Sequence, residues 1–228
     1  DWSSDVCSSD LFGPLKTLQH AKVHDALDVQ PSENAQVHDV VERATQTLLG
    51  LEERLNALDA KVGDGDTGST FALGAQDIAT QLARHALPLN DQAQLLQFIG
   101  ERLVTVMGGS SGVLMSLFFT AAGQALSQGE SLPDALLAGL KQMKFYGGAQ
   151  VGDRTLIDAL QPALEALRDS GLEEAILAAQ RGAESTATMQ QAKAGRASYV
   201  NSDNLNGVPD PGAVAVAEVF AALGKDER

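Results

Sequence analysis

Apolar residues that recur every three or four positions, between short glycine-rich segments, are the feature that most constrains the fold of this chain. Strand-like alternation is missing, and aromatic residues, which favour strands, make up only 4% of the sequence. The glycine-rich segments permit tight corners and close backbone approach. The pattern predicts an all-α bundle with glycine-rich corners. Three stretches show the helical period clearly: Leu96, Ile99, Leu103 and Val106; Leu156, Leu160, Leu164 and Leu167; Val216, Phe220 and Leu223.

Composition and charge exclude several classes of function. The sequence has 16 Lys and Arg against 30 Asp and Glu, a formal net charge of -14. A general nucleic-acid binder needs clustered basic residues, and so does attachment to an acidic membrane surface. No apolar run is long enough to cross a bilayer. The single cysteine, Cys7, excludes an intrachain disulfide framework and favours a reducing cytoplasm.

The chain is expected to contain three regions. Residues 1–11, DWSSDVCSSDL, resemble the translation of a sequencing-library adapter, and we interpret them as a non-native tail. Residues 12–37 contain the segment LDVQPSENAQ and are interpreted as an interdomain linker. Residues 38–228 form the predicted domain. Because no methionine precedes Met107, we expect the chain to be the C-terminal part of a longer protein.

The segment KVGDGDTGST at 61–70 matches the glycine pattern G-x-G-x-x-G, yet the known loops with that pattern do not fit it. A dinucleotide-binding loop follows a buried strand, whereas LEERLNALDA before this loop is typical of an amphipathic helix. A Walker loop ends in Gly-Lys-Ser/Thr, which is absent here. An EF-hand counted from Asp64 would place Gly68 and Ala75 where acidic ligands belong.

Three aspartates, Asp59, Asp64 and Asp66, remain as the chemical content of this loop. Their spacing, D-x4-D-x-D, places them at the end of a helix that Gly63 terminates. Converging carboxylates repel one another, and a helix C-terminus disfavours anions further. Mg²⁺ would resolve this conflict, because it binds a few carboxylates together with waters and phosphate oxygens. An exposed Asp/Gly turn is the alternative interpretation.

Other glycine-rich corners contain possible anion-binding groups. GGSSG at 108–112 precedes an apolar helix, so it predicts either an anion site at the helix N-terminus or a simple turn. Arg154 either pairs with a phosphate or lies in solvent. Arg196 is the better phosphate partner of the pair Lys193 and Arg196, because its guanidinium binds bidentately. Asp210 followed by a proline is typical of a helix N-cap.

Five ordered segments resemble the nucleotide-binding L domain of dihydroxyacetone (glycerone) kinases. They are LNALDAKVGDGDTGST, GGSSG, GDRTLIDAL, TMQQAKAGRASYV and DPGA, and they span about 41–223. The resemblance implies an antiparallel eight-helix barrel with a nucleotide at one end. It also implies that Asp59, Asp64 and Asp66 hold two Mg²⁺ ions and act in catalysis with Arg196. The residues expected to bind ATP or ADP are Thr67, Gly68, Ser69, Thr70, Gly108, Gly109, Ser110, Ser111, Gly147, Leu156, Arg196, Asp210, Pro211 and Gly212.

The family has an ATP-dependent two-domain form and a separate ADP-holding subunit that a phosphotransferase-system protein rephosphorylates. GDGDTGST resembles the loop of the ATP form. In the family, a histidine of the ketose-binding K domain holds the substrate, and His20, His24, His38 and His85 match no such motif. We therefore expect the K domain to lie upstream or in another subunit. A homodimer, and a regulatory module without phosphoryl transfer, are further possibilities.

Overall fold

The computed structural model describes residues 29–193 and 205–225, and in those ranges it contains helices and no β-strand. The predicted all-α class is therefore confirmed. The helices of this part of the chain are α1 (Ala35–Gly50), α2 (Glu52–Val62), α3 (Thr67–Ala83), α4 (Gln92–Val106), α5 (Gly109–Ser127), α6 (Leu132–Gly147), α7 (Ile157–Ser170), α8 (Leu172–Thr186) and α10 (Pro211–Leu223).

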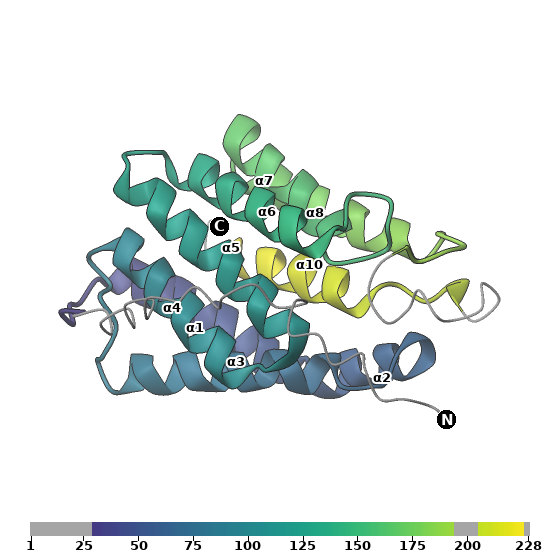
Figure 1. The fold of residues 1–228 in the computed structure, drawn as a ribbon, viewed down its shortest axis with the longest axis horizontal. Coiled ribbons are helices and arrows are strands. Elements are labelled where there is room, and N and C mark those ends of the chain that lie inside the picture. The colour runs from purple at the N-terminus through teal and green to yellow at the C-terminus, as the bar shows by residue number, and fades with distance from the viewer. Residues whose placement is uncertain (1–28, 194–204, 226–228) are drawn as a thin grey trace, which may run out of the picture.

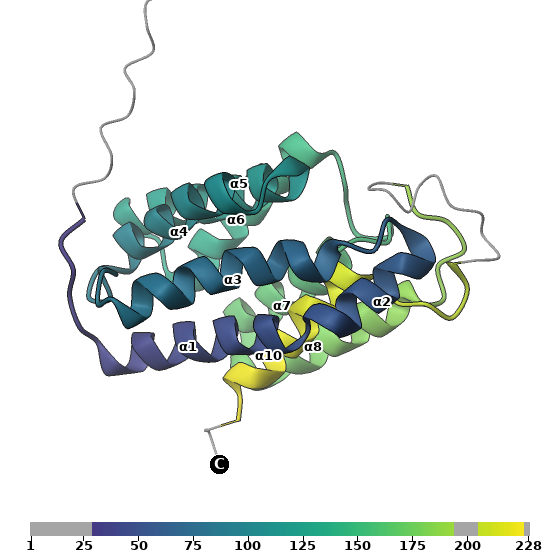
Figure 2. The same ribbon diagram turned by 90° about the horizontal axis from the view of Figure 1, so that it is seen from below.

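Eight of these helices form a closed ring in which each helix packs against the next. Figure 1 shows α5 lying beside α4 and α6 in this arrangement. From α1 the contacts pass to α3, then in order through α4, α5, α6, α7 and α8 to α10, which packs back on α1. Because α4, α5 and α6 are joined by short turns and pack side by side, these neighbours run antiparallel. α2 follows α1 after the single residue Leu51 and lies against α3 and α10 (Figure 2). The predicted eight-helix barrel is confirmed, with α2 as an additional helix.

Two apolar clusters hold the ring together. One is built from α5 to α8 and α10 and includes Leu160, Leu164 and Phe220. The other is built mainly from α1, α3 and α4 and includes Ile99 and Leu103. All five residues are buried, as the helical spacing of apolar positions predicts.

Polar side chains fix the start of several helices. Asn34, Asp91, Ser131 and Asp210 each accept a hydrogen bond from a backbone N–H three residues later. This satisfies one of the N–H groups that the first turn of a helix leaves without a partner. The helix start predicted at Asp210 is confirmed.

The predicted tail at 1–11 and most of the predicted linker at 12–37 lie outside the described residues. The first helix begins at Ala35, so it starts just before the predicted domain boundary at 38. In the described ranges, no helix combines the length and the apolar character needed to span a bilayer.

Candidate nucleotide and metal site

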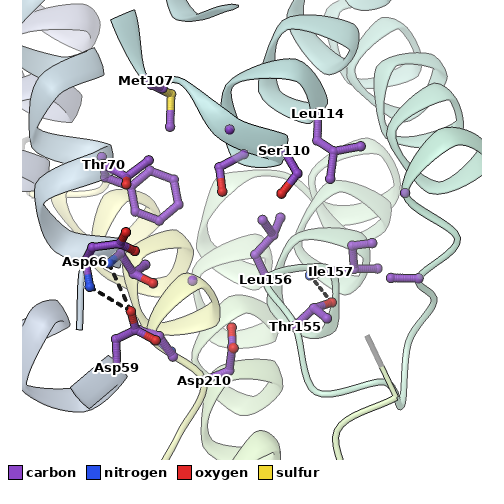
Figure 3. Close-up of a pocket in the computed structure, with 18 of the residues that line it drawn as sticks. Asp59, Asp66, Thr70, Met107, Ser110, Leu114, Thr155, Leu156, Ile157 and Asp210 are labelled. Atoms are coloured by element: carbon purple, nitrogen blue, oxygen red, sulfur yellow. Dashed lines mark hydrogen bonds between the residues drawn. The ribbon is translucent and has the colours of Figure 1, made fainter. Parts of the chain in front are cut away.

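A cavity of about 610 Å³ lies at one end of the barrel, among the loops that join the helices. Its walls come from four parts of the chain: 59–71, 107–114, 143–157 and 210–212. Asp59, Asp66 and Thr70 lie on one side, and Thr155 and Leu156 lie across from them (Figure 3). The fold thus gathers glycine-rich corners that are far apart in the sequence around one space.

Three carboxylates converge on one wall of this cavity. Asp59 lies in the last turn of α2, Asp64 lies in the following loop, and Asp66 directly precedes α3. One ligand oxygen from each side chain lies within 4.8 Å of the other two. Asp59 is buried, whereas Asp64 and Asp66 are exposed. The structure therefore brings together the carboxylates that the spacing D-x4-D-x-D predicts to converge.

Backbone hydrogen bonds hold the Asp59 carboxylate in place. Its Oδ2 accepts from the N–H groups of Gly65 (3.1 Å), Asp66 (2.9 Å) and Thr67 (3.1 Å). A Cβ atom at Gly63 would overlap Oδ1 of Asp59, so only glycine fits directly after α2. The loop is thus folded around this carboxylate, which three backbone N–H groups hold in place.

The donor set fits a divalent cation. Two unit charges about 4 Å apart repel by about 4 kcal/mol at an effective dielectric constant near 20, so the cluster is costly by itself. Mg²⁺ prefers carboxylate oxygens in an arrangement that leaves positions for water and phosphate. Asp59, Asp64 and Asp66 are the residues that would hold such an ion.

The N-terminus of α5 forms another part of the wall. Gly108 and Gly109 have left-handed φ angles of 66° and 57°, and α5 begins at Gly109. Ser110 and Ser111 follow in the first turn and line the cavity, and the Ser110 side chain points into it (Figure 3). Unpaired N–H groups and the positive end of the helix dipole make such a turn suitable for a phosphate group.

Asp210 lies at the start of α10 and also lines the cavity. Its Oδ1 accepts a hydrogen bond of 2.8 Å from the N–H of Ala213. Burial raises the pKa of the Asp210 carboxyl group to about 7, although the Ala213 hydrogen bond and the charge of Arg154 act in the other direction. Next to it, Gly212 lets α10 approach Leu156 closely, because an added Cβ would lie 3.0 Å from the Cβ of Leu156.

Most of the predicted nucleotide and metal residues line this cavity. Gly68 and Ser69 do not: Gly68 packs on the backbone of Glu52, and the Ser69 hydroxyl donates to Glu52 Oε1 at 2.8 Å. Arg196 lies outside the described residues. The predicted residues that line the cavity are Asp59, Asp64, Asp66, Thr67, Thr70, Gly108, Gly109, Ser110, Ser111, Gly147, Leu156, Asp210, Pro211 and Gly212.

Several residues that line the cavity are not predicted from the sequence to do so. Met107, Leu114 and Met143 line the cavity, but in the sequence they belong to ordinary apolar helical stripes. Arg154 also lines it and is only 1% exposed, so the alternative that this side chain lies in solvent is wrong. The helix start GDRTLIDAL draws attention to Arg154 but does not indicate its burial.

A helical barrel whose open end places three carboxylates near a helix N-terminus has the features expected of a metal-dependent phosphate-binding domain. Comparison with known families identifies the family to which the chain belongs. The model of the DAK2 domain family matches residues 61–225. The chain therefore belongs to the DAK2 domain family, in agreement with the resemblance found in its sequence.

Curated relatives of the chain are kinases. The dihydroxyacetone kinase of Citrobacter freundii is 60% identical over 229 residues, which cover 100% of this chain and 41% of that protein. The triokinase/FMN cyclase of Rattus norvegicus is 45% identical over 196 residues, which cover 81% of this chain and 33% of that protein. The chain thus spans less than half the length of these relatives.

Solved structures agree with this assignment. The native form of the C. freundii dihydroxyacetone kinase superposes with a TM-score of 0.81 at 56% identity, covering 90% of this chain and 37% of that one. The complex of the same enzyme with AMP-PNP and Mg²⁺ gives a TM-score of 0.79, covering 90% of this chain and 36% of that one. The similar protein therefore binds a nucleotide analogue and magnesium.

Proposed function

We propose that this chain is the ATP·Mg²⁺-binding domain of a dihydroxyacetone kinase, which provides the phosphoryl group for phosphorylation of dihydroxyacetone (glycerone) or a related small ketose. The names and the structures of its relatives support this assignment. The ketose itself would bind to a K domain outside this chain, either upstream in the same polypeptide or in a separate subunit.

The observation that carries the proposal is the convergence of Asp59, Asp64 and Asp66 on the cavity wall. Three carboxylates favour a cation, and the N-terminus of α5 across the same cavity favours an anion. A nucleotide polyphosphate with bound magnesium satisfies both preferences at once. We further propose two Mg²⁺ ions, which metal titration of the nucleotide complex would count.

Phosphoryl transfer needs positioning and charge stabilisation more than covalent chemistry from the protein. Magnesium bound here would neutralise phosphate charge and orient the transferring group. The N–H groups and hydroxyls at Ser110 and Ser111 would donate to phosphate oxygens, and Leu156 would give the nucleotide an apolar contact. Arg196 is proposed as a further phosphate ligand.

Within the family, the loop GDGDTGST favours the ATP-dependent form over the phosphotransferase-dependent subunit. The two forms differ in how they treat nucleotide. An ATP-dependent kinase exchanges ADP for ATP in every turnover, whereas the other form keeps its ADP bound. Retention of ADP through extensive dialysis would therefore favour the phosphotransferase-dependent subunit.

Calorimetric titration with ATP, in the presence of Mg²⁺ and then of a chelator, tests the proposed function. We expect ATP to bind only with Mg²⁺. We expect Asp64→Asn to weaken ATP binding at least about tenfold, because even the loss of a residue that only supports a metal ligand typically costs that much. Asp169→Asn is a matched control, because Asp169 is exposed at the end of α7 and pairs only with its neighbour Arg168 among the described residues. Equal ATP affinity with and without Mg²⁺ would overturn the proposal.

A further inference from the structure

Arg154 is a buried cation in the cavity wall, and every other charged residue among the described lining residues is an aspartate. It is 1% exposed, and it is the only Lys, Arg or His among the described residues that line the cavity. The same lining contains four aspartates: Asp59, Asp64, Asp66 and Asp210. An arginine is seldom buried this completely unless its charge has a partner.

The hydrogen bonds of Arg154 leave part of its guanidinium unused. Nη2 donates to the carbonyl oxygen of Val208 at 2.6 Å. Nε and Nη1 are buried and have no hydrogen-bond partner within the described part of the protein. Buried donors without an acceptor are costly, so native proteins rarely leave them unpaired without a functional reason.

The backbone at Arg154 supports the same interpretation. Its φ angle is 61°, in the left-handed region that non-glycine residues rarely adopt. Burial lowers the pKa of the guanidinium, while the negative charge of Asp210 raises it. Since arginine stays protonated in proteins, a full positive charge remains in the wall. Unfavourable backbone and unpaired donors in one buried residue are typical of a functional site.

We propose that Arg154 is a further nucleotide-binding residue, whose positive charge and unpaired Nε–H and Nη1–H groups stabilise the phosphate chain of the bound nucleotide. The inference rests on the proposed function. The Nε–H and Nη1–H groups point to different sides of the guanidinium, so each can donate a separate charge-assisted hydrogen bond to a phosphate oxygen. Neither nitrogen is open to water here, so the charge acts first through space, and direct contact requires the side chain to turn toward the cavity.

The inference is tested by measuring the affinity of the protein for ligands that differ in their number of phosphate groups. Adenosine, AMP and ADP are titrated with excess Mg²⁺ into the wild type, Arg154→Met and Arg154→Lys. Loss of a charge-assisted interaction predicts that Arg154→Met weakens ADP binding by about 10- to 100-fold. Adenosine affinity should stay the same, because adenosine has no phosphate, and Arg154→Lys should recover part of the ADP affinity.

Arg181→Met is the matched control for charge. Arg181 is exposed on α8 and pairs with Glu174, so its removal changes the net charge equally but far more weakly at the cavity. We expect it to change ADP affinity by no more than about twofold, because surface charges are screened.

The results separate the inference from the proposed function. If the wild type binds no nucleotide with Mg²⁺, the proposed function fails. If the wild type binds but Arg154→Met loses adenosine and ADP equally, only the inference fails, and Arg154 is structural. Circular dichroism checks the fold of each variant. If Arg154→Met does not fold, Arg154→Lys decides: a loss for ADP but not adenosine supports the inference, and an equal loss overturns it.

Discussion

Substitution of Asp59 by alanine separates the structural role of this residue from its proposed role as a metal ligand. Oδ2 of Asp59 accepts three backbone N–H groups of the loop between α2 and α3, and the side chain is 6% exposed. Asp66 belongs to the same carboxylate cluster but is exposed and, within the described residues, does not cap α3. Asp66→Ala is therefore a matched control that removes one carboxylate without removing these hydrogen bonds.

The structure sets the expected size of the effect. A hydrogen bond to a charged acceptor contributes about 1.5–3 kcal/mol. The three bonds of Asp59 share one oxygen, and the loop can open to water, so their sum is an upper limit. We expect Asp59→Ala to lower the free energy of unfolding by about 3–5 kcal/mol, as for other buried charged partners. Asp66→Ala should change the free energy of unfolding by less than about 1 kcal/mol. The substitution removes a favourable interaction between the carboxylate and the N-terminal end of the α3 dipole, but it also removes repulsion from the carboxylates of Asp59 and Asp64.

Urea denaturation followed by far-ultraviolet circular dichroism, with a chelator present, measures both variants without metal. Asp59→Asn should lie between them, because a neutral amide oxygen accepts the same N–H groups less strongly. Equal destabilisation by Asp59→Ala and Asp66→Ala would refute the reasoning. So would a loss for Asp59→Ala that occurs only when Mg²⁺ is added, since the backbone contacts require no cation.

Three further predictions concern Asp210, Gly68 and Leu156. The folded-state pKa of Asp210, about 7, lies above its ordinary value, so its stabilising contribution is complete at low pH and lost as the pH rises through 7. Asp210→Asn keeps the helix cap and should flatten the curve of unfolding free energy against pH, with a gain of at most about 4 kcal/mol at pH 8. Gly68→Ala should destabilise the fold by about 1–3 kcal/mol in urea, because its Cβ would overlap the carbonyl oxygen of Glu52. Gly50→Ala, whose Cβ would meet no described atom within 4 Å, should be neutral or stabilising. Leu156→Met conserves volume, so calorimetry should find ATP·Mg²⁺ affinity changed by less than about threefold.

Helical period and cap chemistry can be predicted from this sequence because both depend on residues a few positions apart. The inward faces at Leu160, Leu164 and Phe220 and the cap at Asp210 follow from such local rules. The same period could have improved the site prediction. Since α3 begins at Thr67, Thr67 and Thr70 share one helix face and line the cavity, whereas Gly68 and Ser69 face α2.

Features that depend on distant parts of the chain could not be predicted in this way. Gly63 and Gly68 match a phosphate-loop pattern, but the structure gives another reason for glycine there. A Cβ atom at Gly63 would overlap the side chain of Asp59, and a Cβ atom at Gly68 would overlap the backbone of Glu52. The burial of Arg154 depends on a segment 54 residues later, which includes Val208. A motif gives residue types and spacing, and only the packed chain decides what lies opposite each of them.

The contrast between one fixed carboxylate and two exposed ones bears on the choice of metal. Asp59 is buried and accepts hydrogen bonds from the backbone, whereas Asp64 and Asp66 are exposed and line the open cavity. A cluster of three carboxylates, as found among the described residues, would leave positions that water and phosphate oxygens can fill. Ca²⁺ sites usually surround the ion with six to eight oxygens, roughly all from protein and water, whereas Mg²⁺ shares its ligands with a substrate phosphate. An open acidic site beside a helix N-terminus therefore favours a magnesium ion that arrives together with its nucleotide.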